Sequence, residues 1–174
     1  AGYGESNMRG AYRSIGINRN DFMSLIQIND NRPDDLKAIQ WLSFASNAFN
    51  VMVPFYADIE TTPDYLSNTT GEVSTDNFYW SSRMIAAMAD ASYKKSIFHI
   101  ERYQEHVLSK GHEIINRYDD MIQNEADTDK HLALKHEANQ AVADMLKAAT
   151  SDTLGKVLYE LSNEMKNAYS RSDA

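Results

Sequence analysis

The sequence predicts an α+β protein, with a small antiparallel sheet over residues 12 to 53 followed by a region of long helices. Two observations support this prediction. The prolines are Pro33, Pro54 and Pro63, so none interrupts the chain after residue 63, whereas proline and glycine are frequent before it. The apolar residues also change their spacing, from short runs and alternation in the first third to a repeat of three or four residues after residue 76.

The strand-rich part covers residues 1–75. Residues 22–28 are mostly apolar and are followed by Asn29-Asp30-Asn31, a typical turn sequence. In residues 49–53 apolar side chains alternate, and the short Ser46-Asn47 connection predicts an antiparallel hairpin with the preceding strand. Residues 61–76 are interpreted as an irregular polar loop. The expected strands are residues 12–17, 22–28, 39–44 and 49–53.

The helical part covers residues 76–174, and Asp76 is in a position to cap its first helix. The second helix has an apolar stripe from Ile100 to Met121, and Gly111 within it indicates close approach of a neighbouring element. The third and fourth helices are separated only by the polar residues 150–153, so one kinked helix is the alternative. The expected helices are residues 76–95, 97–125, 129–149 and 152–170.

Composition excludes several classes of function. With 43% hydrophobic and 24% charged residues, the chain is typical of a globular domain. It has 17 basic and 25 acidic residues and a net charge of −8 without a basic cluster, so nucleic acid is not an expected partner. No apolar run is long enough for a membrane span, so no membrane partner is expected. The absence of cysteine removes disulfides, thiolate metal sites and a cysteine nucleophile from this chain.

The usual catalytic and metal-binding patterns are missing. His99 and His106 share a helix face but lie two turns apart, and His131 and His136 fall on different faces. Because metal-binding histidines on one helix usually lie three or four residues apart, no metal and no cofactor is expected. There is no GxSxG motif, and Ala1 cannot be an N-terminal nucleophile, so no catalytic residue is assigned.

Arginines are concentrated near the start of the chain. Arg9, Arg13 and Arg19 lie among tyrosines and asparagines, and Arg13 and Arg19 flank the first expected strand. A guanidinium group suits a carboxylate, including that of a peptide substrate. Surface ion pairs with Asp21 or Glu5 are the alternative, and spacing alone favours them.

Several strings resemble, in order, segments of a family of bacterial dipeptidases common in lactic acid bacteria. Residues 12–19, Tyr12-Arg13-Ser14-Ile15-Gly16-Ile17-Asn18-Arg19, are similar to the family's YRPIGINR segment, with Ser14 in place of proline. The other strings are Gln40-Trp41-Leu42, Val53-Pro54-Phe55-Tyr56-Ala57, Thr62-Pro63-Asp64-Tyr65, Asp76-Asn77-Phe78-Tyr79-Trp80 with Arg83, and Ser170-Arg171-Ser172-Asp173. Members are cysteine peptidases with an N-terminal-nucleophile fold.

The resemblance implies a function and a sandwich architecture. In the family the mature chain begins with the nucleophilic cysteine, upstream of these strings, so this chain resembles the C-terminal part of a dipeptidase and would be inactive alone. Its sheet would belong to an αββα sandwich, its partners would be the N-terminal catalytic portion and a dipeptide, and its location would be cytoplasmic. Arg13 and Arg19 become candidates for substrate binding, and Tyr56 is a weaker one.

Two further expectations accompany this interpretation. Without its second layer, the sheet would expose an apolar face, and the chain would self-associate through it. The alternative function is a non-enzymatic helical interaction module, in which the stripe from Ile100 to Met121 is a partner surface instead of part of the core.

Overall fold

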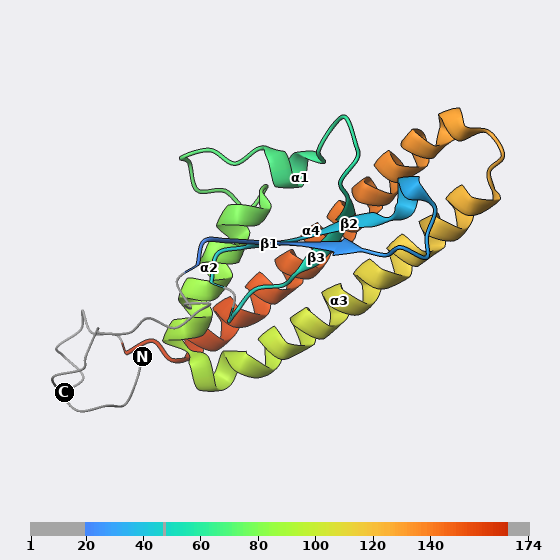
Figure 1. Ribbon diagram of the computed structural model, residues 1–174. Coiled ribbons are helices and arrows are strands. Elements are labelled where there is room, and N and C mark those ends of the chain that lie inside the picture. Colours follow the sequence, from blue (N-terminus) through green and yellow to red (C-terminus); the bar gives the residue numbers. More distant parts are fainter. Residues whose placement is uncertain (1–19, 47, 167–174) are drawn as a thin grey trace, which may run out of the picture.

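The computed structural model describes residues 20–46 and 48–166, and it confirms the predicted α+β class. A three-stranded antiparallel sheet and three longer helices make up most of the described chain (Figure 1). The elements are β1 (Phe22–Ile28), the 3-10 helix η2 (Asp34–Leu36), β2 (Ala38–Phe44), β3 (Val53–Tyr56), α1 (Asp64–Ser67), α2 (Phe78–Ala91), α3 (Tyr93–Asn124), the 3-10 helix η3 (Thr128–Lys130) and α4 (His131–Asn163).

The sheet has the order β1-β2-β3, and both pairs are antiparallel. The predictions of β1 and β2 are confirmed within one residue, whereas the expected strand at residues 12–17 lies outside the described residues. The predicted start of the third strand at Phe49 is wrong, since β3 begins at Val53. Ala45 leaves β2 with a positive φ of 63°. Phe49, Asn50 and Val51 are buried in the connection to β3, where the Phe49 ring packs against Tyr93.

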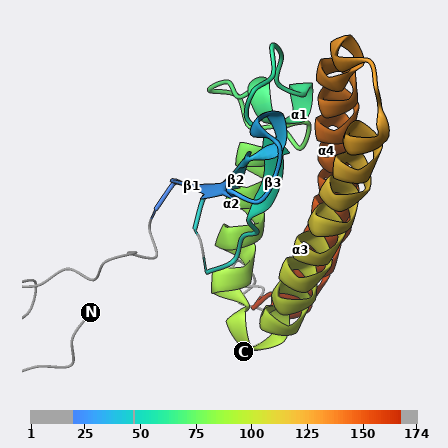
Figure 2. The same cartoon turned by 45° about the vertical axis from the view of Figure 1, so that its right-hand side comes forward.

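α3 and α4 form a long antiparallel hairpin that lies along the sheet (Figure 2). The expected division at residues 150–153 is wrong, since α4 is continuous. Thr150 and Thr153 are buried, and their hydroxyls bond with Tyr103 of α3 and with the carbonyl of Ala149, so this polar patch is satisfied within the helical hairpin. Two other details differ from the sequence prediction: α1 occupies part of the expected loop, and Asn77 caps α2 instead of Asp76.

The apolar stripe on α3 belongs to the core, but the residue buried at its C-terminal end differs from the prediction. Ile100, Tyr103 and Val107 are buried as expected, whereas Met121 is 44% exposed and Ile122 is buried in its place. A straight α-helix drifts by about 20° per heptad, and over six turns this moves the buried face by one residue. Because the stripe packs inside the described chain, it is not a surface offered to another protein. No helix in the described part combines the length and hydrophobicity required to cross a membrane.

β3 is the strand buried between the rest of the sheet and the helical hairpin. All four of its residues are buried, and its Pro54 lies directly against Gly111 of α3. A Cβ atom at Gly111 would come 2.7 Å from Cδ of Pro54, so the glycine permits this close approach, as the sequence indicated. At the other edge, β1 exposes nearly all of its residues, including Leu25, Ile26 and Ile28.

Candidate functional site

A pocket of about 510 Å³ lies between the start of β1, the turn after β2 and one face of α2. Asn20 and Asp21 form its edge on the β1 side, and Phe49 closes it on the side of the connection to β3. α2 contributes Arg83 and Asp90, with two alanines between them. Asn20, which lines the pocket, directly follows in sequence the arginine-rich segment that ends at Arg19.

Arg83 is held at this pocket by two neighbours. Its Nη1 atom donates to Oδ1 of Asp21 at 2.5 Å and lies 3.4 Å from the hydroxyl of Tyr79, and the guanidinium stacks over the Tyr79 ring with 5.7 Å to the centroid. The backbone N–H of Ala45 donates to the Asp21 carbonyl at 2.9 Å and fixes the end of the sheet here. A guanidinium has five N–H donors, and these contacts involve only Nη1. Among the described residues, no contact occupies the other nitrogens, which could bind a carboxylate.

Asp90 is the second charged group of α2 in the pocket. It follows Arg83 by seven residues, about two helical turns, so the two side chains share a face about 10.5 Å apart along the axis. Within the part of the chain that the structure describes, Asp90 forms no ion pair and no side-chain hydrogen bond. As far as residues 20–46 and 48–166 show, the pocket thus combines an arginine with spare donors and a carboxylate without a cation.

Tyr56, a predicted substrate contact, is buried at the opposite end of the sheet. It pairs with Ile39, whereas the pocket adjoins the Phe22 and Phe44 end. Its hydroxyl donates to Oδ1 of Asp119 at 2.7 Å, and burial, followed by this hydrogen bond, raises the pKa of Tyr56. Its hydroxyl therefore serves the packing of β3, and its contact with a substrate stays a prediction.

Two further side chains complete the surroundings of Tyr56. The carboxylate of Asp119 also accepts from Arg32, which joins the β1–β2 connection to α3. The side chain of Asn139, on α4, brackets the Tyr56 backbone: its Oδ1 accepts from the N–H at 2.9 Å and its Nδ2 donates to the carbonyl at 3.0 Å. Sequence reasoning missed these partners because their separations in the chain carry no periodic signal.

His131 lies at the same end, where η2 meets the turn between α3 and α4. Its Nδ1 is 2.8 Å from Oδ2 of Asp35, and its Nε2 is 3.0 Å from the carbonyl oxygen of Glu125. Both neighbours are acceptors, and a neutral imidazole can donate to only one of them. The Glu125 carbonyl, followed by Asp35, therefore raises the pKa of His131. Nearby, Lys135 donates to Asp58 at 2.5 Å, so this end of the molecule is bound together by charged contacts.

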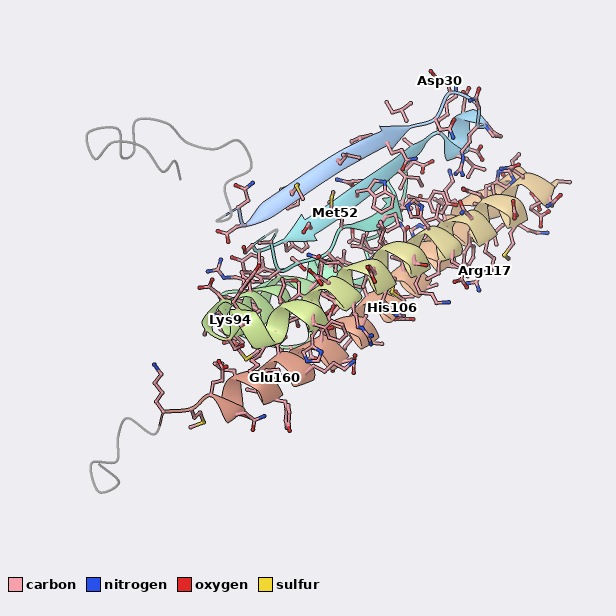
Figure 3. The ribbon with its side chains drawn as sticks, turned by 90° about the horizontal axis from the view of Figure 1, so that it is seen from below. Asp30, Met52, Lys94, His106, Arg117 and Glu160 are labelled. Carbon is pink, nitrogen blue, oxygen red and sulfur yellow. The ribbon has the colours of Figure 1, made fainter. Side chains whose placement is uncertain are left out.

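The remaining expectations from the sequence have separate outcomes. Arg13 and Arg19 lie outside the described residues. His99 and His106 line a groove of about 530 Å³ between α3 and α4, and His99 contacts Glu160 at 3.2 Å. Figure 3 shows His106 on α3 and Glu160 on α4 along the side remote from β1. Among residues 20–46 and 48–166, no group of three histidines and carboxylates is placed to hold a metal ion.

Comparison with known proteins extends the sequence analysis. The model of peptidase family C69 matches residues 1–106, which include β1, β2, β3 and all the α2 residues of the pocket. "Probable dipeptidase A" of Streptococcus pyogenes serotype M3 (strain SSI-1) is 38% identical over 93% of this chain and 34% of its own length. The "Dipeptidase" of Bifidobacterium longum (strain NCC 2705) is 36% identical over 98% of this chain and 39% of its own length.

A third relative shows the same pattern of coverage. "Probable dipeptidase B" of Lactococcus lactis subsp. lactis (strain IL1403) is 33% identical over 98% of this chain and 36% of its own length. The chain thus spans somewhat more than a third of the length of the curated relatives it matches.

Proposed function

The chain belongs to peptidase family C69, and on this premise we propose that the protein carrying it hydrolyses dipeptides. The observation that supports the proposal most is the family match together with relatives named as dipeptidases over nine-tenths of the chain. A pocket lined by the arginine Arg83 and by Asp90, which forms no ion pair with another described residue, is compatible with a small zwitterionic substrate. In the proposal, Arg13 and Arg19 contribute to binding the substrate carboxylate.

We further propose that the nucleophile is a cysteine outside these 174 residues. The sequence contains no cysteine and spans only about a third of its relatives' length. In the proposed reaction, the thiolate attacks the carbonyl carbon of the peptide bond, and the α-amino group of the same cysteine passes the thiol proton to the leaving amine. The C–N bond breaks, a thioester forms, and water hydrolyses it to release the other amino acid and restore the thiol.

This chain would then supply substrate contacts and a support for them. β1 exposes apolar residues on both faces and forms an edge of the sheet within the described residues, which favours contact with a further layer of protein. β3, α3 and α4 form the buried body that holds the other end of the sheet.

The test is the release of free amino acids from a panel of dipeptides. The protein as its organism makes it and the 174-residue chain are assayed side by side, each with and without treatment by a thiol-alkylating reagent. We expect hydrolysis by the former, its loss on alkylation, and no hydrolysis by the latter. A natural protein that cleaves no dipeptide would refute the activity. Alkylation-resistant turnover by the 174-residue chain would refute the proposed nucleophile.

A further inference from the structure

The placement of Asp90 on α2 is not explained by folding. The helix ends at Ala91, so the carboxylate lies in the last turn, where the partial negative charge of the helix terminus disfavours an anion. In the described chain no cation compensates it, and the side chain is exposed toward the pocket. A ligand that brings an ammonium group would supply the missing partner.

Arg83, at the other end of the same face, offers the opposite charge. Asp21 and Tyr79 fix the guanidinium and leave Nε and Nη2 without a described partner. Because the guanidinium is already oriented, the entropy cost of binding a carboxylate from the pocket is lower. Asp21 is thus a positioning residue for Arg83.

The spacing of the two groups matches a molecule of two amino acids. Along the helix axis Arg83 and Asp90 are about 10.5 Å apart. An extended dipeptide spans about 7 Å, and one hydrogen bond of about 2.8 Å at each end brings the total to about 12.5 Å. The guanidinium is held over Tyr79, which lies nearer the start of α2, so the charged groups are further apart than this rise, whereas a tripeptide would need about 3.4 Å more than a dipeptide.

The surface between the two charges leaves room for the peptide. Ala86 and Ala87 place only methyl groups there, and the Phe49 ring forms an apolar wall. A peptide backbone can therefore lie along α2, with a side chain directed toward Phe49.

From these contacts we propose that Arg83 binds the carboxylate of a dipeptide and Asp90 binds its α-ammonium group, so that the pair selects peptides of two residues. The inference rests on the proposed function and assigns substrate-binding residues to it. Both groups act on the ends of the substrate, so their effect falls on KM more than on kcat.

The test compares variants of the natural-length protein on a free dipeptide, its N-acetyl derivative and its C-terminal amide. Arg83→Gln should raise KM for the free dipeptide about tenfold or more, the size expected for a hydrogen bond between charged groups, but should hardly change KM for the amide. Asp90→Asn should do the same for the free dipeptide and spare the N-acetyl derivative. Wild-type protein should prefer the free dipeptide to both derivatives and to the tripeptide.

Two matched controls test whether any surface charge has this effect. Arg117→Gln removes an exposed arginine that stacks on Tyr118 of α3, and Asp120→Asn removes an exposed carboxylate near the C-terminal end of that helix. Both should leave KM unchanged. Asp90→Asn should also melt no lower than wild type, because it removes an unfavourable charge from the end of α2. A lower melting temperature with KM changes common to all substrates would indicate a structural role and refute the inference.

Binding of a dipeptide analogue with a ketomethylene group in place of the peptide bond separates this inference from the proposed function. The analogue is titrated into the natural-length protein by calorimetry. Hydrolysis with KM unaltered in both variants overturns the inference alone. Absence of hydrolysis, with analogue binding that both variants weaken, overturns the function alone. Absence of both hydrolysis and binding overturns both.

Discussion

Replacement of Gly111 by alanine tests the contact between β3 and α3. The new Cβ atom would lie 2.7 Å from Cδ and 3.0 Å from Cγ of Pro54, closer than non-bonded carbons approach. The proline ring is part of the backbone of a buried strand that also pairs with β2, so it cannot rotate away. The helix or the strand must therefore move.

Two opposing effects determine how much Gly111→Ala changes the free energy of unfolding. Alanine favours a helix interior over glycine by about 1 kcal/mol. Overpacking of a close-packed core costs about 1–3 kcal/mol, and the rigid ring places this contact toward the upper end. We expect Gly111→Ala to lower the free energy of unfolding by about 1–2 kcal/mol, or the melting temperature by about 2–8 °C for a chain of this size.

Gly155→Ala on α4 is the matched control. No atom lies within 4 Å of the Cβ position at Gly155, so only the helix preference acts, and stability should rise by up to about 1 kcal/mol. The two substitutions are chemically identical, and urea denaturation of both variants should give changes of opposite sign. A Gly111 variant as stable as wild type would refute the close approach of Pro54 to α3.

Three other predictions concern the two ends of the sheet. Asn139→Ala should lower the free energy of unfolding by about 3 kcal/mol in urea denaturation, because it leaves a buried backbone N–H and carbonyl of β3 unpaired, and a loss below about 1 kcal/mol would contradict this. Since the folded pKa of His131 is raised, its contacts with the Glu125 carbonyl and with Asp35 should stabilise the fold fully below about pH 6.5, and this stabilisation should fade as pH rises through the raised pKa. The melting temperature of His131→Gln should therefore fall below that of wild type in acid and converge with it in alkali, and a pH-independent difference would argue against the ionic contact. Replacing Ile26 and Ile28 of β1 by lysine should abolish the concentration-dependent sedimentation that we expect of the 174-residue chain, and wild-type chain that stays monomeric at every concentration would refute this use of β1.

The sequence was sufficient for features that depend on local patterns. β1 and β2 are apolar runs bounded by turn residues, and the long helices follow from apolar periodicity without proline. The predicted third strand lies earlier in the chain than β3, because Phe49 and Val51 are buried in a connection and have the same apolar alternation as a strand. Burial explains the alternation in both cases, so a short pattern cannot distinguish between them.

The candidate site was harder to predict, because it depends on distant pairs. Asp21 and Arg83 belong to a strand edge and a helix, and only the fold brings them together. The signal that was available is local to α2: opposite charges seven residues apart, with alanines between them and the acidic one near the helix end. That pattern is unfavourable for an isolated helix. The proposed binding of a dipeptide in the pocket would explain both charges.

The two ends of the sheet differ in how firmly they are held, and this bears on where binding occurs. At one end, Tyr56 is fixed to α3 through Asp119 and to α4 through Asn139, with all of these groups buried. At the other end, β1 is exposed and its start is tied to α2 by the half-exposed pair of Asp21 and Arg83. Binding sites are generally drawn from the less stable parts of a fold, because they must admit and release a ligand. A substrate carboxylate that binds Arg83 would therefore act on the same guanidinium that positions the start of β1, and occupancy of the pocket would be coupled to the order of that strand.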